Sequence, residues 1–540
     1  MADDSSTDAS PGGADGIESA VEDAVVLAID LGTGGPKVAL VALSGAVLDH
    51  EHRRVELRVL PGGGAVEDPH EWWEAVLDCA RHLRGRGAVD PARVVAVACT
   101  GQWGSTIPVG RDGQPVGDCM LWLDQRGREL AAARVGGLLA VQGYNPRAAL
   151  EWIRRAGGAP SPEGNDPLGH RLWIRNEEPD VYARTSVFLE PVDYLNLRLT
   201  GRAAATQATM TLSWLTDNRA LDAVDYDPTL LRLARAERSK LPDLLPIRAV
   251  VGRVGDEVAA QLGIPAGTEV VTGLPDLHSA ALGSGAVADH HAHLCIGTSA
   301  WVGCHSPVKR TSLANQMATV PSGLPGRYIL ANNHDCGGVS LEWLRDLVVA
   351  PDDGLGSGTP TLADLDAVAA KVPAGAGGVM FVPWLKGERS PVADTAMRAS
   401  FLNLGIESGR PEMVRAVLEG LAHQMRWIYD ASEKVLKAPL AAPRVLGGGT
   451  QSDLWCQIHA DVLGRTVQRV VDPLMVNVRG AALFAGLVTD RLDVADLADR
   501  APLDRVFRPD PAVTALHEVR HREFVGLNKS QKGFYHHLNR

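Results

Sequence analysis

A glycine-rich turn near the start of the chain holds residues suited to binding phosphate, in the order Asp30-Leu-Gly-Thr-Gly-Gly-Pro-Lys37. Glycines let backbone N–H groups approach phosphate oxygens closely, while Thr33 offers a hydroxyl and Lys37 a positive charge. Asp30 can hold Mg²⁺ through water, because this cation prefers oxygen ligands. A plain hairpin with a turn-favouring Asp explains the same residues, so the motif alone leaves both interpretations open.

Two common nucleotide-binding signatures do not explain the chain. It has no Gly-x-x-x-x-Gly-Lys-Ser/Thr loop. Its one Gly-x-Gly-x-x-Ala match, at residues 283–288, precedes a predicted strand, whereas the dinucleotide-binding motif follows one. Neither a P-loop nor a Rossmann site is therefore expected.

Apolar runs on both sides of the turn predict the strands that position it. Residues 25–30 and 38–43 flank the turn, and a further strand begins at Val47, which predicts a three-stranded antiparallel unit. The pattern returns roughly 265 residues later, where residues 293–303 surround Gly297-Thr298-Ser299. Two such units indicate two related halves that present backbone N–H groups to one ligand, although Gly-Thr turns also recur by chance.

Alternating helical and extended patterns place the chain in the α/β class. Residues 71–83 read as a helix and residues 94–99 as a strand. A second helix begins at Pro411 and keeps its apolar residues on one face, as a scaffold does. Residues 351–361 read as a flexible surface loop, and the stretch from about Phe507 reads as a closing helix.

Length and composition bound the remaining choices. At 540 residues, 45% of them hydrophobic, the chain is long enough for two globular domains. A net charge of −12 with scattered Lys and Arg disfavours nucleic acid as a partner. No apolar run is long enough to span a membrane. The seven cysteines include no Cys-x-x-Cys pair and predict buried thiols in a reducing cytoplasm, and residues 1–24 predict a disordered tail.

Several further motifs make the assignment specific. With the Asp30–Lys37 turn, the chain resembles the FGGY carbohydrate kinases (xylulokinase, glycerol kinase and ribulokinase), which belong with hexokinase and actin. The resemblance covers roughly residues 25–539. The other motifs that carry it are Trp122-Leu-Asp-Gln-Arg126, Pro191-Val-Asp-Tyr194, Cys295-Ile-Gly-Thr-Ser-Ala-Trp301, Phe381-Val-Pro-Trp-Leu-Lys-Gly-Glu-Arg-Ser-Pro391 and Leu446-Gly-Gly-Gly-Thr-Gln-Ser-Asp-Leu-Trp-Cys-Gln-Ile458.

The resemblance implies two actin/hexokinase-like (ribonuclease H-like) α/β domains, residues 25–288 and 289–540, with Mg-ATP in a cleft between them. It assigns the phosphate contacts to the two Gly-Thr turns and the adenosine to the glycine run after Leu446. The expected ATP-binding residues are Thr33, Gly34, Lys37, Gly297, Thr298, Ser299, Gly337, Gly338, Gly448, Gly449, Gln451 and Ser452, with Asp30 at the metal.

Asp276 is the expected catalytic residue, because Gly273-Leu-Pro-Asp-Leu-His is similar to the Gly-x-x-Asp segment of the family. Its carboxylate would accept the proton of the attacking hydroxyl as a general base. Without the resemblance, an Asp after Pro is more often a turn or helix cap. Domain closure is expected to exclude water from the transfer.

The residues expected to hold the acceptor sugar or polyol are Gln102, Trp103, Trp122, Asp124 and Asp276. Xylulokinases usually read Gly-Gln-Met-His-Gly where this chain has Gly-Gln-Trp-Gly-Ser, so the family His is missing and D-xylulose is in doubt. Trp103 is expected to form a flat apolar wall, and a core position is the alternative. Trp122 and Asp124 have structural roles as their alternative.

Some chemically suggestive residues receive a structural interpretation. His290-His291-Ala-His293 reads as a solvated turn and not as a metal site. An ordinary loop is the favoured interpretation of His334-Asp335, with a polar pair near the cleft as the alternative, and Trp72-Trp73 indicates packing at the start of a helix. Relatives commonly dimerise, so a homodimer is an expectation without an assigned interface.

Two other functions remain open at this point. A non-kinase ATPase of the same superfold would share the phosphate turns, because fold alone does not determine function. A catalytically silent sugar-binding regulator would share the sugar site, but its usual helix-turn-helix segment is not evident.

Overall fold

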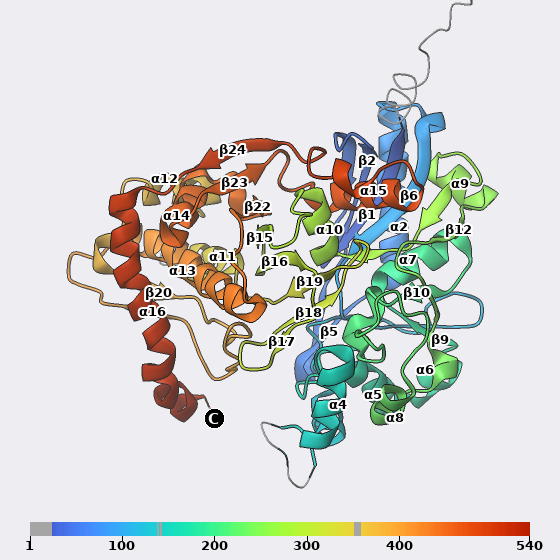
Figure 1. The fold of residues 1–540 in the computed structure, drawn as a ribbon, viewed down its shortest axis with the longest axis horizontal. Helices are drawn as coiled ribbons and strands as arrows, with labels where there is room; N and C mark the ends of the chain where they lie inside the picture. Colours follow the sequence, from blue (N-terminus) through green and yellow to red (C-terminus); the bar gives the residue numbers. More distant parts are fainter. Residues whose placement is uncertain (1–23, 138–139, 141–142, 350–357, 540) are drawn as a thin grey trace, which may run out of the picture.

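The structure is a computed structural model that describes residues 24–137, 140, 143–349 and 358–539. The expected tail lies outside the described residues except for Ala24, and the expected loop at 351–361 lies outside them up to residue 357. Figure 1 shows two lobes side by side, with the N-terminal half on the right and the C-terminal half on the left.

The first lobe is built on a seven-stranded mixed sheet in the order β12-β13-β6-β1-β2-β3, with β14 also paired to β6. Strands β1, β2 and β3 form the expected antiparallel unit, and β6 runs parallel to β1. The strands are β1 (Val25–Gly32), β2 (Gly35–Ala42), β3 (Val47–His52), β6 (Val94–Gly101), β12 (Val250–Arg253), β13 (Glu269–Val271) and β14 (Leu274–Pro275).

The second lobe repeats this strand order in an eight-stranded sheet, β17-β18-β19-β16-β15-β22-β23-β24. Its antiparallel run β15-β16-β19 corresponds to β1-β2-β3, and its parallel run β15-β22-β23 corresponds to β1-β6-β13. The expectation of two similar halves is confirmed. The strands are β15 (Ala292–Ile296), β16 (Ala300–Ser306), β17 (Thr311–Ser312), β18 (Met317–Pro321), β19 (Tyr328–Ala331), β22 (Arg444–Leu446), β23 (Val467–Val470) and β24 (Leu503–Phe507).

Short strand pairs and helices complete the two lobes. The minor strands are β4 (Arg58–Leu60), β5 (Gly64–Glu67), β7 (Ile107–Val109), β8 (Cys119–Met120), β9 (Val187–Leu189), β10 (Ala204–Thr206), β11 (Asp243–Leu245), β20 (Met380–Val382) and β21 (Ser400–Leu402). The helices are α2 (Pro69–Arg86), α3 (Arg128–Val135), α4 (Pro146–Ala156), α5 (Pro167–Glu177), α6 (Pro179–Arg184), α7 (Pro191–Thr200), α8 (Pro228–Ala234), α9 (Asp256–Leu262), α10 (Asp276–Gly283), α11 (Val339–Leu344), α12 (Leu362–Ala369), α13 (Arg410–Leu436), α14 (Asp453–Leu463), α15 (Val476–Val488) and α16 (Pro511–Leu538).

A recurring Asp-Pro or Asn-Pro pair sets the start of several of these helices. The Asp or Asn side chain accepts hydrogen bonds from the first free N–H groups, and Pro supplies a helical φ where no N–H is needed. These caps are Asp68, Asn145, Asp166, Asp227 and Asp510.

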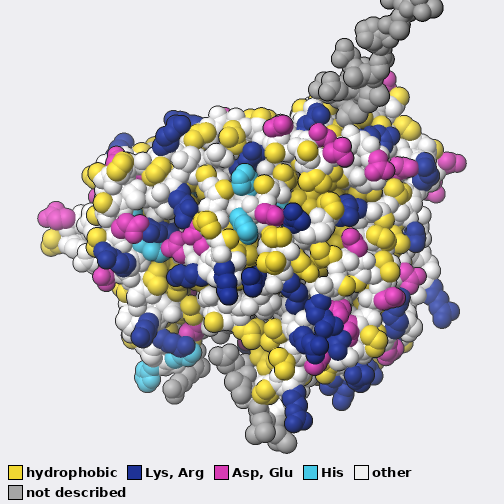
Figure 2. All heavy atoms as spheres, in the orientation of Figure 1, with side chains coloured by type: hydrophobic (Ala, Val, Ile, Leu, Met, Phe, Trp, Pro, Cys, Tyr) yellow, Lys and Arg dark blue, Asp and Glu magenta, His cyan; other side chains and the backbone are white. Residues whose placement is uncertain are grey.

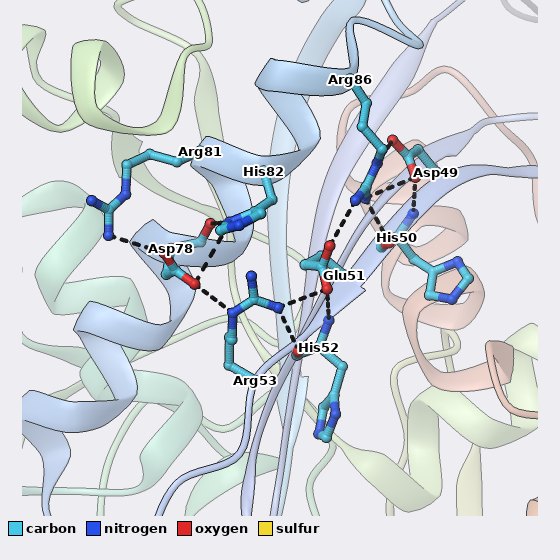
Figure 3. Close-up of polar contacts among 9 residues, drawn as sticks. All are labelled: Asp49, His50, Glu51, His52, Arg53, Asp78, Arg81, His82 and Arg86. Atoms are coloured by element: carbon cyan, nitrogen blue, oxygen red, sulfur yellow. Dashed lines mark hydrogen bonds and ion pairs between the residues drawn. The ribbon is translucent and has the colours of Figure 1, made fainter.

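Helix α2 is tied to the edge strand β3 by the ion pairs drawn in Figure 3. Arg86 pairs with Asp49 at 2.9 Å and with Glu51 at 2.7 Å. Arg53 pairs with Glu51 at 2.7 Å and with Asp78 of α2. Solvent screens exposed pairs of this kind, so they add little to stability. Their main effect is to hold Arg53 where the chain leaves β3.

Helix α15 crosses from the second lobe to the first and packs on the N-terminal sheet, as Figure 1 shows. It meets α10 through glycines: a Cβ on Gly480 would lie 1.9 Å from the carbonyl oxygen of Ser279, and one on Gly283 would lie 1.9 Å from that of Val476. The buried Arg479 side chain also donates to Gly45 O at 2.8 Å. A helix from the C-terminal half thus completes the N-terminal core, and the boundary at residue 288 stays a prediction.

The surface carries mixed charge on the face drawn in Figure 2, with a gathering of Lys and Arg at the lower right, over α4 and α8. A groove there is lined by Arg147, Glu151, Arg155 and Arg232 among others. Arg155 pairs with Glu151 and Asp227, which reduces the local positive charge. Within the described part of the chain, no helix combines the length and the apolar character needed to cross a membrane.

Candidate functional site

The first phosphate turn joins β1 to β2 and exposes Thr33 at its tip. Gly34 and Gly35 have φ angles of 90° and 130°, which favour glycine. A Cβ on Gly35 would lie 2.0 Å from the carbonyl oxygen of Arg53. The turn therefore rests on the backbone after β3, where Asp78 holds the Arg53 side chain (Figure 3).

Glu67 connects this turn to the expected sugar-binding residues, and sequence reasoning did not identify it. Its fully buried carboxylate accepts from Gly34 N at 2.8 Å, from Trp72 Nε1 at 2.8 Å and from Gln102 Nε2 at 3.3 Å. Burial raises the pKa of Glu67, while these donors oppose the rise. One buried acid thus positions both the phosphate turn and the Gln102 amide.

Asp30 and Lys37 lie side by side on β1 and β2, at the junction of the two lobes. Lys37 Nζ is 3.8 Å from Asp30 Oδ2 and donates to Leu474 O, just before α15, at 2.9 Å. Burial raises the pKa of Asp30, although Lys37 and Asn477 oppose the rise. The structure therefore shows Lys37 engaged with the other lobe, and its contact with phosphate stays a prediction.

The residues around Asp30 fit Mg²⁺. Asp30 Oδ1 is buried and has no hydrogen-bond partner among the described residues, and a carboxylate oxygen is a preferred ligand of this cation. No group of three or more His, Cys, Asp or Glu ligands occurs in the described ranges. Mg²⁺ commonly uses one or two carboxylates together with phosphates and water, so a single carboxylate such as Asp30 is compatible with this cation, and its role as the ligand stays a prediction.

Asp276 is the first residue of α10, beside the end of the N-terminal sheet. Its Oδ1 accepts from Leu277 N at 2.7 Å. Burial raises the pKa of Asp276 to about 7, and the negative charge of Asp30 adds to the rise. Burial also raises the pKa of the Cys295 thiol, with the Asp276 charge contributing, so β15 ends near this carboxylate. A carboxyl group with a pKa near neutrality is suited to accept a proton.

The second phosphate turn, Gly297-Thr298-Ser299, joins β15 to β16 and exposes Thr298. Gly297 O accepts from Gly338 N at 2.6 Å. A Cβ on Gly337 would lie 2.8 Å from the same oxygen. The structure thus brings Gly337 and Gly338 directly against the turn with which the sequence grouped them.

His334 departs from the expectation of an ordinary loop. Its side chain is completely buried, and Nδ1 lies 2.7 Å from Glu388 Oε2. Burial alone lowers the pKa of an imidazole, but the Glu388 carboxylate outweighs this effect and the pKa of His334 is raised. The neighbouring Asp335 pairs with Arg389 at 3.1 Å. Sequence reasoning missed these partners because 54 residues separate each pair.

The glycine run after β22, which is expected to lie beside the adenosine, packs against the second phosphate turn. A Cβ on Gly449 would lie 2.4 Å from Ile296 Cγ2, whereas one on Gly448 would have no neighbour within 4 Å. Gln451 is exposed, and Ser452 caps α14 by accepting from Trp455 N at 2.9 Å. Gly448 and Gln451 therefore offer open surface beside the turn.

Trp103 contacts α10, the helix that begins at Asp276, and Trp122 contacts Thr33 of the first phosphate turn. The half-buried Trp103 ring packs edge-on against His278, with centroids 5.6 Å apart, and its Nε1 donates to Thr209 O at 2.8 Å. Trp122 Nε1 donates to Thr33 Oγ1 at 3.1 Å. Two of the expected sugar-binding residues thus contact the expected catalytic helix and the expected phosphate turn.

Glu190 and Asp124 are buried acids that hold the chain around Trp103 and Trp122 through hydrogen bonds. The buried Glu190 accepts from Gly104 N at 3.0 Å and from Ser105 N at 3.2 Å, which anchors the loop after Trp103. Asp124 is also buried, accepts from Ala65 N at 3.0 Å and pairs with Arg126 at 2.7 Å. These contacts are structural, and a contact of Asp124 with sugar stays a prediction.

The burial of the remaining sequence motifs tests their structural interpretations. His293 is buried in β15 beside Trp301, whereas His291 is exposed, so the solvated-turn interpretation holds for only part of that motif. Trp72 and Trp73 are buried in the N-terminal core, as expected. All seven cysteines are buried and free.

Family matches follow the two lobes. Residues 25–283 match the N-terminal domain of the FGGY family of carbohydrate kinases, and residues 292–488 match its C-terminal domain. The chain belongs to the FGGY family. Family membership and the paired sheets confirm the expected α/β class with two actin-like kinase domains.

FGGY relatives cover nearly the whole chain but differ in substrate. A xylulose kinase of Staphylococcus epidermidis is 25% identical over 522 residues, which is 94% of this chain and 97% of the relative. A glycerol kinase of Gloeobacter violaceus is 31% identical over 508 residues, covering 89% and 92%. A solved gluconate kinase from Lactobacillus acidophilus shares the fold, with a TM-score of 0.82, 22% identity and coverage of 95% and 99%.

As an FGGY kinase, the protein is an ATP-dependent carbohydrate kinase. This membership favours a kinase over the ATPase and regulator alternatives. The relatives do not determine the sugar, because their names include xylulose and glycerol kinases at comparable identity.

Proposed function

We propose that the protein transfers the γ-phosphoryl group of Mg-ATP to a hydroxyl of a small open-chain sugar or polyol, with Asp276 as the general base. The observation that carries this proposal is the position and the pKa of Asp276. It lies at the start of α10, and burial together with the negative charge of Asp30 raises its pKa to about 7. A base with this pKa accepts a proton effectively at neutral pH.

Mg-ATP is held between the lobes in this proposal. Backbone N–H groups and hydroxyls at Thr33, Gly34, Thr298 and Ser299 contact the phosphates, and residues 448–452 lie beside the adenosine. Exposed Thr33 and Thr298 and the open space around Gly448 support these roles. Mg²⁺ neutralises phosphate charge when bound, and Asp30 is the residue that would hold it.

The acceptor lies beside Asp276, against Trp103 and Gln102. The apolar Trp103 ring removes a polar partner for sugar hydroxyls, which favours acceptors other than D-xylulose. By analogy with its relatives, the proposed acceptor is a related ketose or polyol that offers a terminal primary hydroxyl. Closure of the lobes would exclude water, which otherwise competes for the phosphoryl group. The seven buried free thiols support a cytoplasmic location.

ADP release is the assay that tests the proposal. Purified protein is supplied with Mg-ATP and, separately, with ketopentoses, ketohexoses, pentitols, tetritols, gluconate and glycerol. Stimulation by one acceptor, lost in Asp276→Asn, is the expected result. Acceptor-independent ATP hydrolysis would instead support the ATPase alternative, and no ADP release with any acceptor would support the regulator.

A further inference from the structure

The segment that carries His334 lies directly behind the second phosphate turn. His334 N donates to Ala300 O at 2.8 Å, and Ala300 N donates to His334 O at 2.9 Å. Gly338 N donates to Gly297 O at 2.6 Å. These bonds fasten the turn at both of its ends, so displacement of residues 334–338 would also displace the backbone N–H groups of the turn.

The His334 side chain connects this segment to a different part of the C-terminal lobe. Its partner Glu388 also accepts from Arg389 N at 2.8 Å and from Ser390 N at 3.2 Å through its other oxygen. Ser390 O in turn accepts from Gln424 of α13 at 3.0 Å, and Gln424 is fully buried. A continuous set of hydrogen bonds therefore runs from α13 through Glu388 and His334 to the phosphate turn.

Replacing only one member of the His334–Glu388 pair should be more destabilising than replacing both. Both side chains are completely buried, and His334 Nε2 has no hydrogen-bond partner in the part of the chain that the structure describes. Glu388 is thus the side chain that pairs with the buried His334 ring, and His334 is the side chain that pairs with Glu388 Oε2. Replacing one member leaves the other as a buried polar group without this partner, whereas replacing both by amides does not.

We infer that His334 and Glu388 form a positioning pair that holds the second phosphate turn in its nucleotide-binding shape. The inference rests on the proposed function, in which that turn contacts ATP phosphates. Neither residue needs to touch the nucleotide, because His334 acts through Ala300 and the Gly337-Gly338 backbone. Nucleotide affinity should therefore depend on the pairing itself and not on either side chain alone.

A double-mutant cycle on Mg-ADP affinity tests this inference without knowledge of the sugar. The dissociation constant is measured by titration calorimetry for the wild type, His334→Gln, Glu388→Gln and the double variant, below the unfolding temperature of each. Each single variant is expected to bind at least tenfold more weakly. The double variant is expected to return to within threefold of the wild type, because two amides can share a neutral hydrogen bond.

Asp289→Asn is the matched control, because it breaks the partly exposed Arg327–Asp289 pair at 2.7 Å in the same lobe. Its affinity should stay within twofold of the wild type. Single variants that bind like the wild type, or losses that simply add in the double variant, would overturn the inference. Failure of the wild type to bind Mg-ADP would overturn the proposed function as well.

Hydrogen exchange decides the question if a single variant does not fold. In the wild type, Mg-ADP is expected to slow exchange of the Gly338 amide at least tenfold, because nucleotide on the turn would stabilise its bond to Gly297 O. An unchanged exchange rate at Gly338 in protein saturated with Mg-ADP would overturn the coupling between this segment and the turn.

Discussion

Replacing Asp276 with Asn changes the proposed proton acceptor and little else. The Asn side-chain oxygen can still accept from Leu277 N, the contact that Asp276 Oδ1 makes at 2.7 Å, so α10 should begin at the same residue. Loss of a general base typically lowers kcat by about 10²–10⁴-fold. KM for ATP should change little, because Asp276 is not among the proposed nucleotide contacts.

The pH dependence of the wild type provides a second magnitude. With a pKa of about 7 for Asp276, roughly 9% of the free enzyme carries the charged base at pH 6 and roughly 91% at pH 8. The kcat/KM for Mg-ATP, measured with the acceptor far below its own KM so that it reports the free enzyme, should therefore rise about tenfold over this range.

Steady-state rates of ADP formation at pH 6, 7 and 8 measure both effects in one series. Equal thermal unfolding temperatures for the wild type and Asp276→Asn are the control for correct folding. A variant within tenfold of the wild-type kcat would refute the assignment of Asp276 as the base. A flat kcat/KM profile between pH 6 and 8 would refute the pKa argument.

The remaining predictions concern packing, acid stability and the acceptor site. Gly480→Ala should destabilise the protein by about 1–3 kcal/mol, because the new Cβ would lie 1.9 Å from Ser279 O. Gly526 is an exposed residue of α16, and a Cβ there would meet no atom within 4 Å. Gly526→Ala should therefore stabilise the protein by about 0.5–1 kcal/mol; equal denaturant midpoints for the two variants would contradict the argument. Burial lowers the pKa of His517 to about 4, so the folded state keeps it neutral while the unfolded state takes up a proton below about pH 6.5. The free energy of unfolding is thus unaffected by this residue above pH 6.5. It decreases as the pH falls from 6.5 toward 4, by up to about 1.4 kcal/mol per pH unit. His517→Gln should reduce the slope of the free energy of unfolding against pH between pH 5 and 7, measured by urea denaturation, by an amount that corresponds to about one proton. An unchanged slope would exclude His517 as a source of this pH dependence. Trp103→Leu should raise the KM of whichever acceptor is found and leave the KM of ATP unchanged; a change confined to ATP would place Trp103 outside the acceptor site.

Local patterns were sufficient to predict the two phosphate turns and the strands beside them. The apolar runs around Gly32–Gly35 and Gly297–Ser299 allow only a narrow set of backbone shapes, and both are confirmed as strand–turn–strand units. The similarity of the two halves was also predictable from these turns. The parallel pairing of β1 with β6 and of β15 with β22 extends this similarity to strand order, which a single motif does not encode.

Buried acids that support the site were not predicted, because their partners are remote in sequence. Glu67 joins Gly34, 33 residues before it, to Gln102, 35 residues after it. Glu190 supports Gly104 from 86 residues away. An ordinary loop was the favoured prediction for His334, and only the folded chain shows that it is buried and paired with Glu388. An acid at the end of an apolar run, as in Gly64–Glu67, is the one local signal that could have indicated such a role.

Mass analysis of the acceptor after incubation with Mg-ATP tests the central claim most directly, because it detects the transferred group itself. The acceptor that stimulates ADP release should gain one phosphoryl group in wild-type reactions, in amounts equal to the ADP formed, and should stay unmodified with Asp276→Asn. ADP formation without any phosphorylated acceptor would contradict the account of this protein as a carbohydrate kinase.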